Sequence, residues 1–175
     1  MIFKSWAMRN CGLLLLRSLI DCLFGTSESK ISIEAGWDGR STKLSYEKYP
    51  ALPELLLSLL DNNNAEQINA SAIGAVQSVF PALDIIRRAG PPMVLRNEIE
   101  TGVAAHLGSK VWHIRELAAR TMCTFMLHGG WLPALKALLA SSNTSTNHTH
   151  GVLMTVKFLL ERRLELFSCP PGMWL

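Results

Sequence analysis

One helical pattern, at residues 110–128 (KVWHIRELAARTMCTFMLH), most constrains what this chain can fold into. At about 100° per residue, the apolar side chains of this stretch share one broad arc with Trp112, and only Arg115 interrupts that arc. The solvent-facing side would carry His113, Glu116, Arg120 and Thr124. The pattern predicts an amphipathic helix whose apolar arc, Trp112 included, packs against other helices.

Residues 5–24 repeat the same signature. When Trp6 is aligned with Trp112, Arg9 takes the phase of Arg115, again inside an apolar arc. Two helices 106 positions apart therefore share the spacing Trp-x-x-Arg with the cation directed at the apolar side. This recurrence indicates a repeated structural unit.

A guanidinium inside an apolar arc needs hydrogen-bond acceptors, because burying an unpaired charge destabilises the fold by roughly several kcal/mol. Acceptors can be a carboxylate or helix-end carbonyls of a neighbouring unit, and an arginine can instead extend its head to water. The sequence does not decide between these. We predict that Trp6, Arg9, Trp112 and Arg115 are structural anchors. The candidate acceptors are Glu54, Asp61, Asp84 and Glu98.

The rest of the chain also reads as helices, at about 3–24, 50–60, 65–89, 92–107, 131–140 and 152–163. Pro81 is expected to kink or split the third of these. Residues 92–107 and 110–128 would form an antiparallel hairpin, with Ser109 as the N-cap of the second helix. We expect polar loops at 26–48 and 141–150 and an irregular tail at 164–175. The prediction is an all-α fold, an α-solenoid of HEAT/armadillo-like hairpins over residues 1–175.

The composition limits the cellular setting. Four cysteines without a C-x-x-C pair indicate reduced thiols, and no apolar run is long enough for a membrane span. Reduced thiols are typical of cytosolic or nuclear proteins. Of these two locations we predict the cytoplasm, and we predict no membrane insertion.

No catalytic motif accompanies these helices, so the chain is not expected to be an enzyme. There is no phosphate-binding loop, dinucleotide fingerprint, H-E-x-x-H or G-x-S-x-G motif. His148 and His150 lie in a polar stretch and are a weak metal pair. We predict no catalytic, metal or cofactor site. The net charge of +3 permits contact with nucleic acid, for which Arg87, Arg88 and Arg120 are the candidate residues for RNA or a partner.

Four segments, taken in order, resemble the DUF2428 region of the THADA family, whose fungal members act in tRNA modification. They are WAMRNCGLLL (6–15) followed by LFG (23–25), FPALDIIRR (80–88) and VWHIRELAAR (111–120). The resemblance implies that this chain is a segment of a larger helical solenoid.

It also implies a function. The chain would be a non-catalytic scaffold for an FtsJ-like methyltransferase that methylates the ribose 2′-hydroxyl of a cytidine in the tRNA anticodon loop. The methyl donor and catalytic residues would belong to that partner. The alternative is a generic protein-interaction solenoid without a role on RNA.

Overall fold

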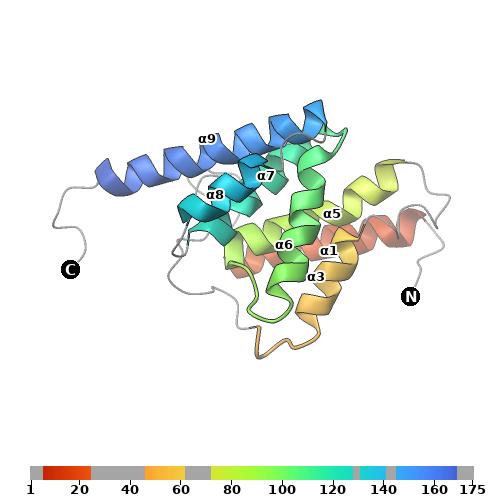
Figure 1. Ribbon diagram of the computed structural model, residues 1–175. Coiled ribbons are helices and arrows are strands. Elements are labelled where there is room, and N and C mark those ends of the chain that lie inside the picture. The colour runs from red at the N-terminus through yellow and green to blue at the C-terminus, as the bar shows by residue number, and fades with distance from the viewer. Residues whose placement is uncertain (1–5, 25–45, 62–71, 128–130, 141–144, 169–175) are drawn as a thin grey trace.

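The computed structural model describes residues 6–24, 46–61, 72–127, 131–140 and 145–168. Within these ranges, the side chains of 72–78 and 164–168 and some of those of 6–24 are not described. These residues form helices and contain no strand, which confirms the prediction of an all-α fold (Figure 1). The elements are α1 (Trp6–Phe24), α3 (Leu52–Leu60), α5 (Ala72–Ala89), α6 (Arg96–Ala105), the 3₁₀ turn η1 (His106–Gly108), α7 (Trp112–Met126), α8 (Trp131–Ala140) and α9 (Thr146–Ser168).

The helices are arranged in two layers. In one layer α1 packs on α5, α5 on α7 and α7 on α9. In the other layer α3 packs on α6, while α3, α6 and α8 each contact the first layer through α5, α7 and α9 respectively. Figure 1 shows α9, α7, α5 and α1 following one another from top to bottom, with α8, α6 and α3 in front. This stack of helical pairs is an α-solenoid, as the sequence predicts.

Proline and glycine set several helix boundaries. Pro53 lies in the first turn of α3, where its missing N–H leaves no hydrogen bond unmade. The helix α5 ends at Ala89 because Gly90 follows with a φ of 92°, a left-handed conformation that ends helices, and two prolines come next. The side chain of Tyr46 fixes this end of α5, since its hydroxyl donates to the Gly90 carbonyl at 2.7 Å.

Some predicted boundaries are wrong. The helix α9 begins at Thr146, inside the predicted loop 141–150, because the Ser145 hydroxyl accepts the His148 N–H at 3.2 Å and caps the first turn. It continues to Ser168, so the first part of the predicted tail 164–175 is helical. The helix α5 is not split at Pro81, whose following turn is held by buried side chains. Most of the predicted loop 26–48 lies outside the described residues.

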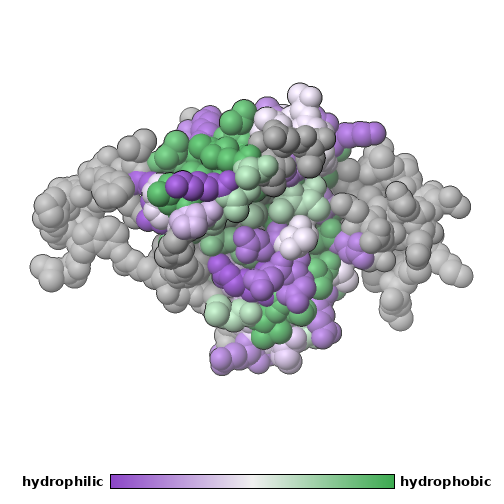
Figure 2. Space-filling model, viewed as in Figure 1, coloured by the Kyte–Doolittle hydropathy of each residue, from purple (hydrophilic) through white to green (hydrophobic). Residues whose placement is uncertain are grey.

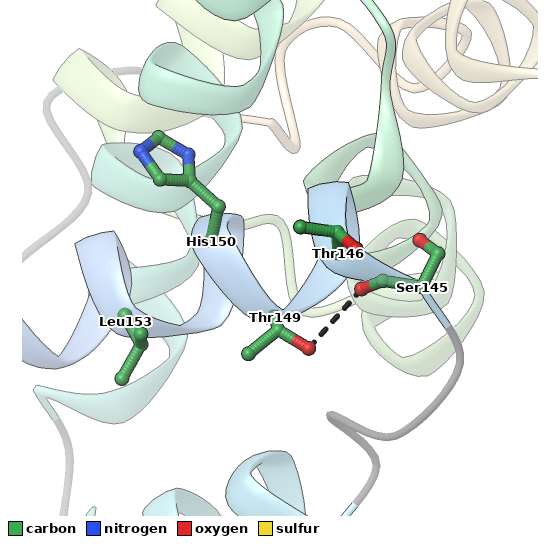
Figure 3. A pocket seen from close by; sticks show the side chains of 5 residues that line it. All are labelled: Ser145, Thr146, Thr149, His150 and Leu153. Carbon is green, nitrogen blue, oxygen red and sulfur yellow. Dashed lines mark hydrogen bonds between the residues drawn. The ribbon is translucent and has the colours of Figure 1, made fainter.

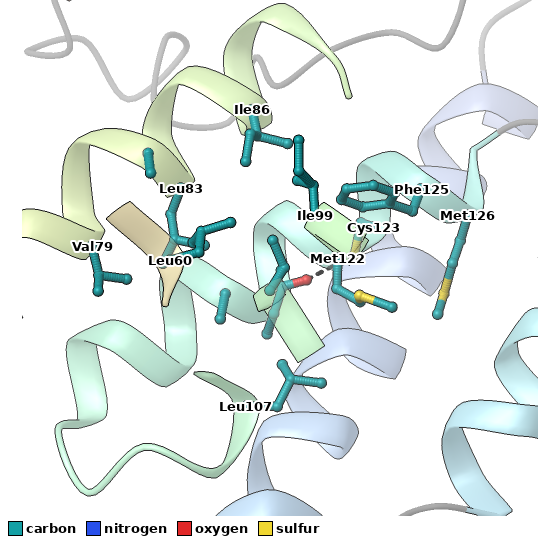
Figure 4. Close-up of a cluster of buried hydrophobic side chains, with 14 of the residues drawn as sticks. Leu60, Val79, Leu83, Ile86, Ile99, Leu107, Met122, Cys123, Phe125 and Met126 are labelled. Atoms are coloured by element: carbon teal, nitrogen blue, oxygen red, sulfur yellow. Dashed lines mark hydrogen bonds between the residues drawn. The ribbon is translucent and has the colours of Figure 1, made fainter. Parts of the chain in front are cut away.

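The core lies between the two layers and is centred on α7. Figure 4 shows side chains from α3, α5, α6, η1 and α7 converging there. Among those with no or almost no exposed surface are Leu60, Leu83, Ile86, Ile99, Leu107 and Met126. Full burial of each such side chain stabilises the fold by about 1.5–3 kcal/mol before conformational entropy is subtracted. The helix predicted at residues 110–128 is therefore the central helix of the core, and its apolar side chains pack there.

Two residues of α7 depart from the predicted pattern. Trp112 is 46% exposed, so the prediction that it packs on the core side is wrong. It lies at the first position of α7, where its ring meets the His113 ring edge-on at 4.9 Å. Thr124, predicted to face solvent, is 2% exposed, and its hydroxyl donates to the Thr121 carbonyl at 2.7 Å. Helices α6, α8 and α9 all contact α7, and this packing accounts for the burial of Thr124.

A buried histidine joins α3 to η1. The Nε2 of His106 lies 2.9 Å from the Leu60 carbonyl, at the last residue of α3, and the imidazole is 4% exposed. A carbonyl accepts only from an N–H, so Nε2 carries the proton. Burial lowers the pKa of His106 and outweighs the opposite effect of this hydrogen bond.

We expect the stability of the fold to decrease as the pH falls below about 6.5, the ordinary pKa of histidine. The unfolded chain takes up a proton there, whereas folded His106 does so only at lower pH, so acid favours the unfolded state by at most about 1.4 kcal/mol per pH unit. Urea unfolding at pH 7.5 and 5.5 measures this loss, and a His106→Gln variant should lose less over the same interval. Equal losses in the two proteins would contradict the assignment.

Candidate functional site

Arg87 and Arg88, predicted to contact RNA or a partner, are buried instead. Their exposed fractions are 6% and 3%. Arg87 binds Asp84 at 2.7 Å, and Arg88 lies 3.5 Å from both Asp84 and Asp21 of α1. The prediction of surface contact is wrong because α1 packs on α5 over these side chains. Arg88 therefore joins α5 to α1, whereas Arg87 pairs with an aspartate of its own helix.

Arg115 finds acceptors in the backbone. Its Nη1 donates to the carbonyls of Ser109 at 2.6 Å and Lys110 at 3.2 Å, in the turn between η1 and α7. None of the four predicted carboxylates accepts from it, and one of them, Asp84, binds Arg87 and Arg88. Ser109 is not the N-cap of α7, which is Val111. The Ser109 hydroxyl instead accepts the Val111 N–H at 3.2 Å. Arg115 thus holds the turn that starts α7.

The companion anchors Trp6 and Arg9 belong to α1, but their side chains lie outside the described part of the structure. Their predicted role as anchors stays a prediction.

Two arginines that the sequence did not single out as anchors hold the other end of α7. Arg96 of α6 donates to the Phe125 carbonyl at 3.2 Å, and Arg163 of α9 donates to the Leu127 carbonyl at 3.3 Å. Both guanidinium groups also lie over aromatic rings, Arg96 over Phe125 at 5.3 Å and Arg163 over Trp131 at 5.5 Å. Cations at a helix C-terminus complement its carbonyls and dipole. Helices on both sides of α7 therefore clamp its end.

Arg120 is the one predicted contact residue that keeps access to solvent. Its side chain is 30% exposed and pairs with Glu116 at 3.1 Å on the same helix. The guanidinium lies over the Phe158 ring of α9, 4.0 Å from the ring centroid, and Lys157 Nζ lies 5.8 Å from the same centroid. We call the group of Arg120, Lys157 and Phe158 the α7–α9 seam.

A buried thiol lies beneath this seam. Burial raises the pKa of Cys123 to about 12, and the positive charges of Arg162 and Arg120 act in the opposite direction. Cys123 is 4% exposed, and its Sγ lies 3.3 Å from the Ala119 carbonyl and 3.5 Å from that of Thr155. The thiol is therefore a core group without nucleophilic character.

An open hollow of about 480 Å³ lies at the start of α9 and is lined by Ser145, Thr146, Thr149, His150 and Leu153. Figure 3 shows the His150 ring pointing away from Thr149, whose hydroxyl donates to the Ser145 carbonyl at 3.1 Å. Within the described ranges, no three histidine, cysteine or acidic side chains are grouped so that they could hold a metal ion. In the part of the chain that the structure describes, no helix is both long and apolar enough to cross a membrane.

The hydropathy of the outer surface differs from one helix to another. Figure 2 shows hydrophobic side chains gathered over α8 and a hydrophilic area over α6. On α8, Leu132 and Leu139 are 48% and 41% exposed. On α1, Met8, Leu15 and Leu19 are exposed by half or more, at helical spacing. Exposed apolar side chains that gather on one surface are typical of surfaces that contact another protein.

Comparison with known proteins identifies what this stack of helices is similar to. A family model described as the C-terminal TPR repeats of Trm732 matches residues 9–159. The tRNA (32-2′-O)-methyltransferase regulator trm732 of Schizosaccharomyces pombe is 26% identical over 168 residues, which cover 90% of this chain and 11% of the relative.

Two primate proteins give the same result. The tRNA (32-2′-O)-methyltransferase regulator THADA is 29% identical over 177 residues in Chlorocebus aethiops and 28% identical over 171 residues in Homo sapiens. In each case 89% of this chain and 9% of the relative are covered. The chain thus spans about a tenth of the length of the curated relatives it matches. No solved structure matches.

Proposed function

The chain belongs to the family of Trm732 C-terminal TPR repeats, and on that premise we propose that it is a non-catalytic scaffold segment supporting ribose 2′-O-methylation of tRNA. The observation that carries the proposal is the match to proteins named as regulators of a tRNA (32-2′-O)-methyltransferase over about nine-tenths of this chain. A regulator acts on an enzyme, so the catalytic residues belong to another protein.

The positions of the charged side chains support a scaffold role. Arg87, Arg88, Arg96, Arg115 and Arg163 all bind groups of neighbouring helices, turns or their own helix. These contacts fix the helices relative to one another and leave the outer surfaces for binding. Within the proposal, the partner is an FtsJ-like methyltransferase that supplies the methyl donor site, and the substrate is a cytidine at position 32 of tRNA.

The proposal includes a cytoplasmic location. Cys11 and Cys22 are free and exposed on α1, and exposed thiols stay reduced in a compartment with a reducing thiol pool. The assignment of the segment to the DUF2428 region remains a prediction.

The test is mass spectrometry of tRNA from cells in which the locus encoding this chain is disrupted. We expect 2′-O-methylation at position 32 to be lost and to return when the intact locus is restored. As a control, a base methylation elsewhere in the same tRNA should stay constant. Unchanged methylation at position 32 would overturn the proposal.

The alternative is a protein-interaction solenoid without a role on RNA. The exposed apolar side chains of α1 and α8 favour it, because they suit protein contacts better than phosphate contacts. Under this alternative, disruption leaves tRNA unchanged, and partners recovered with the tagged chain from cells are lost when Leu132 and Leu139 are replaced by serine.

A further inference from the structure

Positive charge is concentrated toward the C-terminal end of the stack. Residues 110–168 contain seven lysines and arginines against three acidic residues, a net charge of +4. Residues 46–109 contain four basic and seven acidic residues, a net charge of −3. The modest net charge of the whole chain therefore conceals a basic half formed by α7, α8 and α9. A local positive potential of this kind attracts polyanions.

Only some of these cations are available to a ligand. Arg115 and Arg163 are engaged with backbone carbonyls at the two ends of α7. Lys157 is 66% exposed and Arg120 30% exposed, and the two share the Phe158 ring. The α7–α9 seam is thus a place where an exposed lysine, a partly exposed arginine and an aromatic ring lie together.

The guanidinium of Arg120 is held in a fixed orientation. Its Nε and Nη2 both donate to Glu116 Oε1, at 3.4 and 3.1 Å, while Phe158 supports its plane. Within the described part of the chain, Nη1 has no acceptor. A phosphate oxygen binding there would meet a donor whose rotamer is already ordered, so less conformational entropy is lost on binding.

Among the side chains that the structure describes, the two carboxylates beside these cations do not cancel the positive charge of this half. Glu116 is engaged by Arg120, and Glu161 lies 3.8 Å from Lys157 on the same face of α9. Arg162 adds a further positive charge on α9, and this charge opposes the effect of burial on the pKa of Cys123. Both carboxylates are already counted in the net charge of +4 over residues 110–168.

We propose that the α7–α9 seam binds the sugar-phosphate backbone of tRNA, with Arg120 and Lys157 as the contacting cations. The inference rests on the proposed function, which supplies the reason for choosing RNA over an acidic protein. It assigns the RNA contact to a surface distinct from the apolar side chains of α1 and α8. Arginine beside an aromatic ring is also a pairing that proteins use at RNA-binding surfaces.

The experiment measures binding of a fluorescently labelled, unmodified tRNA transcript to the 175-residue chain by anisotropy, across a range of salt concentrations. The test variant is Arg120→Gln/Lys157→Gln. The control is Lys48→Gln/Lys136→Gln, which removes the same charge from exposed positions before α3 and on α8. We expect the test variant to bind at least about tenfold more weakly, and the slope of log affinity against log salt to fall by about 1.5, from two lost phosphate contacts. The control should stay within about twofold.

Equal weakening of the two double variants would overturn the inference, because tRNA binding would then depend on the net charge of the chain and not on the position of the cations. Absence of tRNA binding by the unaltered chain would also overturn it. Should Arg120→Gln disturb folding, as judged by circular dichroism, Lys157→Gln against Lys48→Gln gives the same comparison at two exposed lysines.

The outcome is separable from that of the proposed function. If disruption of the locus abolishes methylation at position 32 but the Arg120→Gln/Lys157→Gln variant restores it and binds tRNA normally, the seam assignment fails and the function stands. If this variant binds tRNA normally but no longer captures the methyltransferase, the seam contacts an acidic protein surface instead.

Discussion

Replacing Gly151 with alanine is expected to lower the stability of the fold by about 3 kcal/mol or more, at the upper end of overpacking costs. The helix α9 crosses η1 at this position, and an added Cβ would overlap the Leu107 carbonyl oxygen and lie 2.9 Å from its carbonyl carbon. Both groups are backbone, so no side-chain rotation relieves the overlap. The helix α9 must move away from η1, which uncovers Leu107 and Val152, both fully buried.

Thermal or urea unfolding of Gly151→Ala measures this effect, with Gly12→Ala as the matched control. A Cβ at Gly12 of α1 meets no atom within 4 Å. The control substitution should stabilise the chain by up to about 1 kcal/mol, because alanine is the better helix former. A Gly151→Ala chain as stable as the unaltered one would mean that α9 does not approach η1 so closely.

Replacing Arg88 with alanine is expected to cost about 2–4 kcal/mol. Removing one partner of a buried pair costs about 3–5 kcal/mol, and the lower figure here reflects the partial exposure of Asp21 and Asp84, by which water can solvate them. The loss should weaken the packing of α1 on α5 first, since Arg88 joins Asp21 of α1 to α5. Urea unfolding gives the free energy, and hydrogen exchange should show faster exchange in α1 than in α7.

The exposed pair of Lys157 and Glu161 provides the comparison. Lys157→Ala removes an ion pair whose partners are 66% and 54% exposed, and such pairs contribute about 0–1 kcal/mol. If Arg88→Ala were as mild as Lys157→Ala, the guanidinium would be solvated, and its sequence-based interpretation as a surface contact residue would be restored.

The burial of two of the predicted arginines limits which side chains of this chain can contact RNA. Of the three residues predicted to contact RNA or a partner, Arg87 and Arg88 are in the interior, and Arg120 is on the α7–α9 seam. Lys157 was not singled out from the sequence, although a lysine on the exposed side of a helix is a detectable signal. The proposed tRNA surface therefore consists of one predicted residue and one that required the packing of α9 on α7.

The fold class could be predicted because helical periodicity is a local property. Apolar spacing in residues 110–128 fixed which side of α7 is buried, and Gly90 with two prolines fixed the end of α5. The polar composition of residues 145–150 suggested a loop, but the Ser145 cap and the packing of α9 against η1 made them helical. Local propensity is weak beside tertiary burial at such positions.

The sequence by itself determined that the chain is a stack of amphipathic helices, and that arginines near apolar arcs must find acceptors. Only the tertiary structure decided which acceptor each arginine has: two carbonyls of a turn for Arg115, and carboxylates of two helices for Arg88. The physical reason is the separation in sequence between the residues that interact. Periodicity depends on residues three or four positions apart, whereas Arg88 and Asp21 are separated by 67 positions and meet only because α1 packs on α5.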